Sequence, residues 1–114
     1  MRGEATRVQL FKSATQIFIP LFVIGELHAG FAAGTQANVN VRNLERFLAN
    51  PVVSVLLPDV ATTLQYAALF AQLRRQGTPI PTNDLWIAAL SLQYDLILCT
   101  RDEHFRHIPQ LKIC

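Results

Sequence analysis

The sequence predicts an α/β fold of three layers, α/β/α, built around a parallel sheet. Short apolar stretches alternate along the chain with longer helical stretches, and Gly and Pro residues separate them without forming a linker. Strands that alternate with helices are joined by right-handed crossovers, which make the strands parallel. A chain of 114 residues without internal repeats has the size of one domain, so we expect a single domain over residues 1–114.

The first half of the chain contains two predicted strands and two predicted helices. Residues 16–20, QIFIP, are a short apolar run typical of a buried strand, and residues 21–34 follow as a helix that stops at Gly34. Residues 40–50 carry apolar side chains at helical spacing and predict the second helix. Residues 51–57, PVVSVLL, are rich in β-branched side chains and predict the second strand.

The second half begins with a predicted helix that Asp59 caps. This helix covers residues 60–77 and ends at Gly77, which is a typical residue for a helix stop. Arg74 and Arg75 lie near its end, shortly before this stop. The apolar stripe along the helix is typical of a helix that packs against a core.

A further helix and a third strand complete the predicted fold. Pro81 sets the entry of the helix, Thr82 or Asn83 caps it, and the helix runs to about Tyr94. Residues 95–100, DLILCT, are an apolar run that predicts the third strand. Whatever follows this strand therefore lies at the carboxyl end of the sheet, where open α/β folds place their sites.

The composition and the charge limit the class of protein. Hydrophobic residues make up 51% of the chain and charged residues 16%, a balance typical of globular rather than disordered proteins. The formal net charge of +2 is too small to indicate a polyanion-binding protein by itself. Charge alone therefore leaves the partner open.

Two cysteines and one apolar segment bear on the cellular compartment. Cys99 and Cys114 have neither the spacing of zinc ligands nor the density of a disulfide scaffold, which favours a reducing cytoplasm. The apolar segment 17–34 is interrupted by a proline, a glutamate and a histidine. Its uninterrupted part is too short to span a bilayer and fits a signal peptide poorly, so we expect a cytoplasmic protein without a membrane partner.

Three of the eight acidic residues lie in unusual places among the apolar elements. Glu26 lies in an apolar helix whose neighbouring positions are apolar or small, and an ionised side chain there needs a partner. Asp84 lies directly before the apolar run LWIAAL at the start of a helix. Asp102 follows the predicted strand LILCT at its carboxyl end. We expect these three side chains to come together at one edge of the sheet.

Carboxylates that converge in this way repel one another unless a cation lies among them. Oxygen ligands alone select Mg²⁺ or Mn²⁺, which keep several waters and engage phosphate oxygens. The chemistry that follows is hydrolysis of a phosphodiester bond assisted by the ion. The sequence therefore predicts catalytic and metal-ligand roles for Glu26, Asp84 and Asp102.

Each acid also has an ordinary structural explanation. Asp84 is an acid in the first turn of a helix, which gains roughly 0.3–1 kcal/mol from the helix dipole. Asp102 is a suitable cap or loop residue within TRDEHF. Glu26 is a residue whose long side chain can reach solvent. Only the joint placement of the three acids favours a site.

Three segments carry a specific combination of motifs: IFIPLFVIGELHAG, PDVATTLQYAALFAQL and LRRQGTPIPTNDLWIAALSLQYDLILCTRDEHFRHI. The order Gly-Glu-Leu, then Asn-Asp-Leu-Trp-Ile-Ala-Ala, then Thr-Arg-Asp-x-His-Phe resembles a PIN domain, and specifically the VapC-type toxins of bacterial toxin–antitoxin pairs. The resemblance runs from about Ile17 to the end of the chain. It implies a Mg²⁺- or Mn²⁺-dependent endoribonuclease with an RNA substrate, a homodimer, and a small antitoxin protein that holds the enzyme inactive.

The resemblance also implies roles for individual residues. Glu26, Asp84 and Asp102 match three of the family's four metal-site acids, while Asn83 and Thr100 match polar neighbours that orient these acids through hydrogen bonds. Four basic residues are candidate contacts to RNA phosphates, although each is equally an exposed helix or loop residue: Arg101, His104, Arg74 and Arg75. The other two histidines receive no role.

The first strand of the family pattern is the point of departure. Family members open with an apolar strand that ends in Asp-Thr-Asn or a close variant, lies in the middle of the sheet and supplies the first metal acid. Residues 1–15, MRGEATRVQLFKSAT, indicate instead the helical stretch that precedes IFIP, and Glu4 does not substitute for the acid. We therefore expect a PIN-like domain that lacks its central first strand, with unpaired strand edges and one metal ligand fewer.

Two other functions stay open. A catalytically impaired PIN-like remnant would bind an antitoxin or RNA through the same acidic cleft without cutting RNA. A receiver-type phosphoacceptor domain is the third possibility, but no predicted strand ends in an Asp that is joined to an acidic pair and a positioned Lys.

Overall fold

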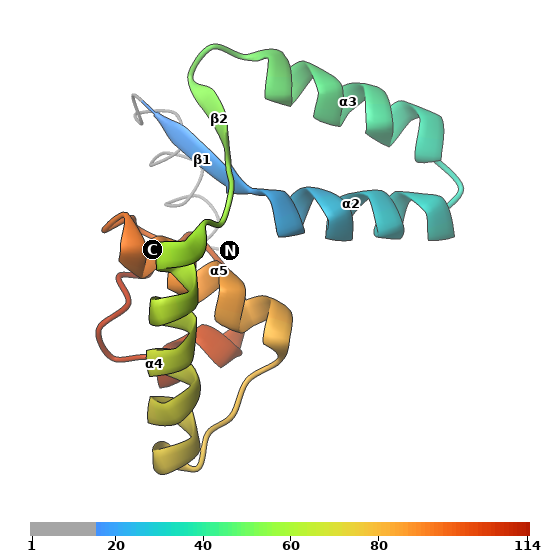
Figure 1. The fold of residues 1–114 in the computed structure, drawn as a ribbon. Coiled ribbons are helices and arrows are strands. Elements are labelled where there is room, and N and C mark those ends of the chain that lie inside the picture. Colours follow the sequence, from blue (N-terminus) through green and yellow to red (C-terminus); the bar gives the residue numbers. More distant parts are fainter. Residues whose placement is uncertain (1–15) are drawn as a thin grey trace. The chain divides into compact units, whose positions relative to one another are not determined.

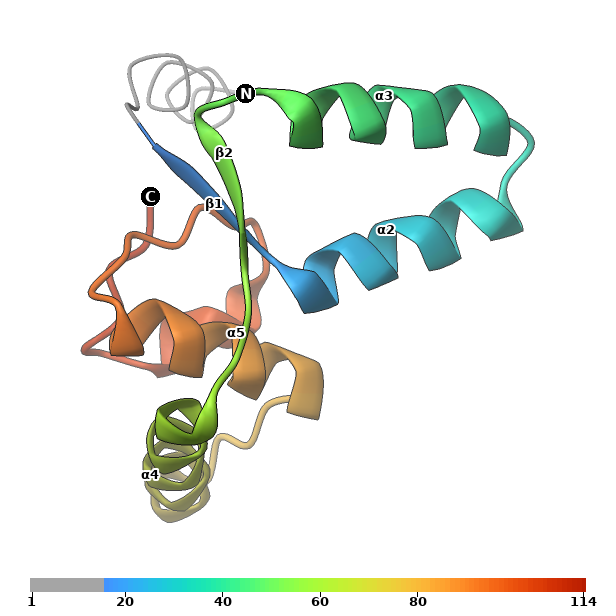
Figure 2. The ribbon, with the colours of Figure 1, turned by 45° about the horizontal axis from the view of Figure 1, so that its top comes forward.

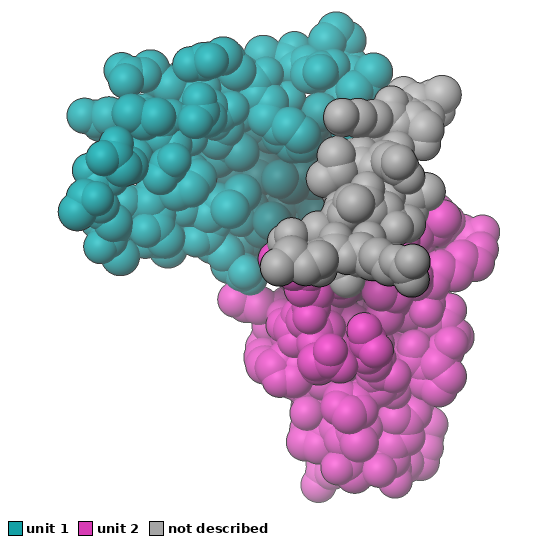
Figure 3. All heavy atoms as spheres, turned by 180° about the vertical axis from the view of Figure 1, so that it is seen from behind, with its two compact units in different colours: residues 1–57 teal, residues 58–114 magenta. Residues whose placement is uncertain are grey.

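The computed structural model describes residues 16–114. The chain divides into two compact units, with the boundary between Leu57 and Pro58. Figure 3 colours the two units separately. The helical stretch predicted for residues 1–15 and the assessment of Glu4 lie outside the described residues. The single domain over residues 1–114 stays a prediction.

From residue 16 onward, the first unit contains a parallel pair of strands connected by two helices (Figure 1). Its elements are β1 (Ile17–Pro20), α2 (Leu21–Ala33), α3 (Ala37–Ala49) and β2 (Val53–Leu56). Ile17 pairs with Val53 and Pro20 with Leu56, so β1 and β2 run parallel over their full lengths. The predicted α/β class and the parallel sheet are confirmed, and the sheet has two strands within the described residues.

Helices α2 and α3 form the connection between the two strands. Figure 2 shows the chain running outward along α2 and returning along α3 to β2. Gly34 ends α2 at the predicted position, and its N–H donates to the carbonyl of Phe31 at 3.1 Å. Ile24, Leu44 and Val53 are the buried apolar residues that hold the described part of this unit together.

The second unit consists of two packed helices and a short terminal turn. Its elements are α4 (Val60–Gln76), α5 (Thr82–Gln93) and the 3₁₀ helix η1 (Glu103–His107). Leu69 and Leu73 of α4 are each 1% exposed and Leu90 of α5 is fully buried, so the two helices share one apolar core. Tyr66 of α4 also stacks on Trp86 of α5, with ring centroids 4.2 Å apart.

A polar network joins the beginning of α4 to the end of α5. Asp59 caps α4 as predicted, because its carboxylate accepts from the N–H of Thr62 while its own N–H donates to the Thr62 hydroxyl. The side-chain amide of Gln93 donates to Asp59 at 2.8 Å and accepts from Thr62 at 2.5 Å. The hydrogen bond from Gln93 lowers the pKa of the Asp59 carboxyl below its usual value. Thr62 is therefore a fully buried polar residue with every partner in place.

The two helix ends of this unit use left-handed residues. Gly77 has φ 75° and ends α4 as predicted, which allows the N–H of Thr78 to donate to the carbonyl of Leu73. Asp95 has φ 52° and occupies the same position after α5, where the N–H of Leu96 donates to the carbonyl of Ser91. Asp is one of the few residues that tolerates this conformation, so the chain turns here without a glycine.

The predicted cap of α5 is wrong. The helix begins at Thr82, and Pro81 occupies the capping position in an extended conformation without a side-chain hydrogen bond. Thr82 and Asn83 are therefore already helical residues of the first turn. Pro81 contributes its carbonyl instead, which accepts from the N–H of Leu85 at 3.1 Å.

The third strand predicted for residues 95–100 is also wrong. Within the described residues this segment forms one isolated parallel bridge, between Leu98 and Ile113. Leu98 donates to the carbonyl of Lys112, and its own carbonyl accepts from Cys114. The segment must first turn through Asp95 to leave α5, so few residues remain in an extended conformation, and their partner at residues 112–114 is equally short.

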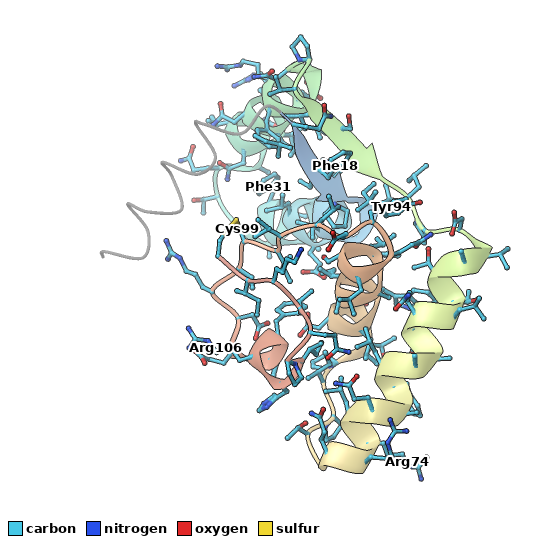
Figure 4. All side chains as sticks on the ribbon, turned by 90° about the vertical axis from the view of Figure 1, so that its left-hand side faces the viewer. Phe18, Phe31, Arg74, Tyr94, Cys99 and Arg106 are labelled. Atoms are coloured by element: carbon cyan, nitrogen blue, oxygen red, sulfur yellow. A yellow bond between two sulfur atoms is a disulfide. The ribbon has the colours of Figure 1, made fainter. Side chains whose placement is uncertain are left out.

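The same bridge explains a disulfide that the sequence did not lead us to expect. Cys99 directly follows Leu98, and Cys114 directly follows Ile113. The Cα atoms of the two cysteines lie 4.9 Å apart, and their sulfur atoms form a disulfide bond. This separation lies within the range that disulfide geometry requires. Figure 4 labels Cys99 at this position. Two cysteines are too few to indicate a disulfide-rich protein. The bond between Cys99 and Cys114 depends on the contact of Leu98 with Ile113, which the sequence did not predict.

The described residues contain no helix with both the length and the apolar character needed to cross a bilayer.

Candidate metal centre

Asp84 is fixed by the helix that it opens. It is the third residue of α5, and the helix continues directly into the buried side chains of Leu85 and Ile87. Because these residues pack into the core, the first turn of α5 is held firmly and its carboxylate is only 14% exposed. A largely buried acid at this position needs hydrogen bonds or a cation to balance its charge.

Asp102 and His104 belong to the short turn that forms η1. Asp102 caps η1, and its Oδ1 atom accepts from the N–H of His104 at 2.9 Å. Thr100 supports the turn from the other side, because its hydroxyl oxygen accepts from the N–H of Asp102 at 3.1 Å. Phe105 follows His104 and is 3% exposed, so it anchors η1 in the core beside α5. The turn therefore presents Asp102 and His104 from a fixed backbone.

The structure brings Asp84, Asp102 and His104 together. The Nδ1 atom of His104 lies 3.0 Å from Oδ2 of Asp84 and 3.0 Å from Oδ1 of Asp102. One ligand atom from each of the three side chains lies within 4.8 Å of the other two. Two of the three predicted acids thus share one cluster, although they are far apart in the sequence.

The electrostatics of the cluster favour a cation. Burial raises the pKa of the Asp84 carboxyl above its usual value; the hydrogen bond with His104 lowers it, and the nearby charge of Asp102 raises it. Burial and a like charge both disfavour the ionised carboxylate. A divalent ion beside Asp84 would remove this penalty and stabilise the charged form.

The donor set also suits a metal ion. Two carboxylate oxygens and one imidazole nitrogen are common ligands of divalent metals in proteins, and here all three lie within 4.8 Å of one another. Asp102 and His104 are 42% and 48% exposed at their side chains, which leaves an open approach for waters and a substrate. The residues present therefore fit a divalent ion that retains several waters.

Glu26 lies on α2 in the first unit, and its side chain is exposed. An exposed glutamate has no burial penalty to balance, so the sequence argument that Glu26 needs a partner does not hold in the described part of the chain. The role of Glu26 as a metal ligand stays a prediction.

The two polar residues predicted to orient the acids, Asn83 and Thr100, make different contacts. Thr100 contacts the main chain of Asp102 and therefore positions this acid through the backbone rather than through its carboxylate. Asn83 is exposed in the first turn of α5, and it makes no hydrogen bond to the carboxylate of Asp84 or Asp102 within residues 16–114. Its predicted orienting role stays a prediction.

The basic residues predicted to contact RNA lie on exposed parts of the second unit. Arg74 and Arg75 are in the last turn of α4, and Figure 4 shows Arg74 at this end of the helix. Arg101 is exposed directly before Asp102. The ring nitrogen of His104 lies 3.0 Å from one oxygen of each of the two aspartates, and its predicted RNA contact stays a prediction. The spacing Asp-x-His within one tight turn was the available signal.

The chain is similar to known proteins in sequence and in fold. The PIN domain family matches residues 2–111. Ribonuclease VapC1 of Haemophilus influenzae strain R2866 is 29% identical over 109 residues, which cover 95% of this chain and 80% of that protein.

Two solved structures are similar in fold. The structure of VapBC-1 from nontypeable Haemophilus influenzae matches with a TM-score of 0.80 and 27% identity, over 100% of this chain and 84% of that chain. VapBC-5 from Mycobacterium tuberculosis, a member of the VapBC family of toxin–antitoxin systems, matches with a TM-score of 0.69 and 24% identity. The second match covers 82% of this chain and 77% of that chain.

Proposed function

This chain belongs to the PIN domain family, and from that starting point we propose that it is a metal-dependent endoribonuclease that hydrolyses RNA phosphodiester bonds. We take it to be the toxin of a toxin–antitoxin pair, because the relatives with similar sequence and fold are a VapC ribonuclease and VapBC assemblies. The observation that carries the proposal is the cluster of Asp84, Asp102 and His104, with three potential ligand atoms within 4.8 Å of one another.

Asp84 and Asp102 would hold the ion in this proposal, while the metal-ligand role of Glu26 stays a prediction. Asp84 comes from a helix fixed by the core, and Asp102 from a turn fixed by Phe105, so both carboxylates keep their positions while substrate binds. Mg²⁺ or Mn²⁺, when bound, supplies positive charge that stabilises the phosphate oxygens during hydrolysis. Water attacks the phosphorus atom, the bond to the leaving oxygen breaks, and that oxygen takes up a proton.

The exposed basic residues position the RNA backbone. Arg74 and Arg75 form a pair of positive charges at the end of α4, and Arg101 adds a third beside the acids. Arginine binds phosphate oxygens without reading the base sequence, so these residues contribute affinity rather than specificity.

The partners and the compartment follow from the same proposal. A toxin of this type works on cytoplasmic RNA, forms a homodimer and is kept inactive by a bound antitoxin protein. The VapBC assemblies with similar fold support the antitoxin partner.

Cleavage of RNA by the purified chain tests the proposal. Mn²⁺ is titrated into wild type and into Asp84→Asn, and the variant is expected to lose about 100-fold or more in rate, because even residues behind metal ligands are worth about 10–100-fold. Asp95→Asn is the matched control, since Asp95 is an exposed aspartate that pairs with Lys112 away from the cluster. Its left-handed conformation also suits Asn.

Equal cleavage by wild type and Asp84→Asn would refute the metal-site role of Asp84. Metal-dependent RNA binding without any cleavage would support the alternative of an impaired PIN-like remnant.

A further inference from the structure

We infer that His104 is itself a ligand of the divalent ion, so that the centre contains a nitrogen donor beside the carboxylates and prefers Mn²⁺ to Mg²⁺. This inference rests on the metal site of the proposed function and goes further, because it assigns a ligand and a metal preference to a residue that the sequence analysis considered only for RNA contact.

The two distances from the Nδ1 atom of His104 match the spacing of neighbouring ligands of one ion. The Nδ1 atom of His104 lies 3.0 Å from one oxygen of each aspartate. Two adjacent ligands of an octahedral ion with bonds of about 2.1 Å are separated by about 3 Å. The nitrogen therefore stands at the spacing of a neighbouring ligand to both carboxylates, and the two oxygens lie within 4.8 Å of each other.

His104 is held in this position by its own backbone. Its N–H donates to Oδ1 of Asp102, and the next residue is the buried Phe105. These contacts fix the backbone of His104, and the contacts of Nδ1 with the two aspartates orient its ring. A ligand that is already in place loses little conformational entropy when an ion binds.

The ring can offer a lone pair to the ion. A neutral imidazole carries one proton, on either of its two nitrogens, and the other nitrogen is then an acceptor or a metal ligand. The side chain of His104 is 48% exposed, so Nε2 can keep its proton and donate it to water while Nδ1 faces the aspartates. A neutral His104 ring can therefore bind the ion through Nδ1 while its proton stays on Nε2.

A nitrogen ligand changes which ion binds best. Mg²⁺ binds oxygen ligands and water almost exclusively, whereas the first-row transition ions also accept imidazole. His104 therefore increases the affinity for Mn²⁺ and leaves the affinity for Mg²⁺ nearly unchanged. The alternative explanation of the same distances is a hydrogen-bonding clamp, in which an Nδ1–H group donates to the two carboxylates and binds no metal.

Pulsed electron paramagnetic resonance of bound Mn²⁺ distinguishes the two explanations. The wild-type chain and His104→Gln are compared with His107→Gln, a matched control because His107 is an exposed histidine in the same helix η1 and outside the cluster. Wild type and His107→Gln are expected to show nitrogen coupling to Mn²⁺ that changes on labelling the histidines with ¹⁵N. His104→Gln is expected to lose this coupling.

Calorimetric titration provides the second readout. Mn²⁺ binding is expected to weaken by about 10-fold or more in His104→Gln, with a change of less than about threefold for Mg²⁺. The far-ultraviolet circular dichroism of each variant verifies that η1 and the helices remain folded.

The outcomes separate this inference from the proposed function. Mn²⁺ binding that Asp84→Asn abolishes, but that shows no histidine coupling in wild type, overturns the ligand role of His104 and leaves the metal site standing. Equal weakening of Mn²⁺ and Mg²⁺ by His104→Gln likewise supports the clamp and overturns the inference. Absence of Mn²⁺ binding by the wild-type chain overturns both the inference and the metal dependence of the proposed function.

Discussion

Phe105 is expected to connect the stability of the second unit to the proposed metal centre, and Phe105→Ala tests this connection. Phe105 is 3% exposed and belongs to η1, which packs against α5. Removing a buried aromatic side chain costs about 3–5 kcal/mol. A chain of 114 residues has a free energy of unfolding of about 6–17 kcal/mol, so the variant is expected to fold but with much of its stability lost.

Urea unfolding followed by circular dichroism measures the loss. With a slope of about 1–3 kcal/mol per molar urea, the midpoint of Phe105→Ala is expected to fall by roughly 2 M. Phe105→Leu keeps an apolar anchor and is expected to lose only about 1–2 kcal/mol. Phe70→Ala is the control, because Phe70 is 48% exposed on α4 and its removal is expected to cost no more than about 1 kcal/mol.

Metal binding gives the functional half of the same experiment. Under conditions where Phe105→Ala is fully folded, its Mn²⁺ affinity is expected to fall, because η1 no longer holds Asp102 and His104 beside Asp84. Phe105→Leu is expected to retain most of the affinity. An unchanged urea midpoint, or full Mn²⁺ affinity in a destabilised Phe105→Ala, would refute the argument that this ring anchors the centre.

Three other perturbations address the acid, the buried hydroxyl and the disulfide. Burial raises the pKa of Asp84 above 3.8, so the folded state holds the proton more tightly than the unfolded state, and stability is lost as the pH rises through the two pKa values. In metal-free buffer, Asp84→Asn is therefore expected to melt at a higher temperature than wild type at pH 7, with the difference vanishing below pH 3.8. Thr62→Val removes the hydroxyl that bonds Asp59 and Gln93 and is expected to lower the free energy of unfolding by about 1 kcal/mol, and Thr62→Ser by less. Reduction of the Cys99–Cys114 bond, which closes a loop of 15 residues, is expected to cost about 3 kcal/mol in urea unfolding.

Each of these expectations has a contrary result. A lower melting temperature of metal-free Asp84→Asn at pH 7 would show that the helix dipole outweighs burial and the charge of Asp102. Equal stability of Thr62→Val and wild type would show that the hydroxyl network adds no net stability. Identical urea curves for the oxidised and reduced chains would show that the terminal segment contributes nothing to the unit.

The helices were largely predictable from the sequence because their signals are local. Asp59 and Gly77 mark the two ends of α4, and both act as their residue types indicate. Each cap needs only a side chain and the three or four residues beside it. The two strands were predictable for a similar reason, because each is a short apolar run between clear boundaries.

The errors concern features that depend on distant contacts. Residues 95–100 have an apolar composition suited to a strand, but strand formation requires a partner, and the partner segment at residues 112–114 forms only one bridge. The disulfide depends on the same contact. Pro81 was expected to lead into the helix, yet it takes the capping position itself.

The site shows the same limit. Asp84 and Asp102 were predictable as a pair from their places beside apolar elements. The position of His104 was not, because it depends on how tightly η1 turns and on where α5 places Asp84. The sequence indicates which residues could lie close together. The conformation of η1 determines that Nδ1 of His104 contacts both aspartates.

The network of Asp59, Thr62 and Gln93 fixes how far α5 can slide along α4. Leucines at helical spacing would tolerate a shift by one turn, because one leucine can replace another. Such a shift of about 5.4 Å would carry the amide of Gln93 away from its two partners and leave the hydroxyl of Thr62 dry in the core. The polar contacts of Gln93, at the end of α5, thus fix the position of α5 along α4. This position determines where the first turn of α5 places Asp84.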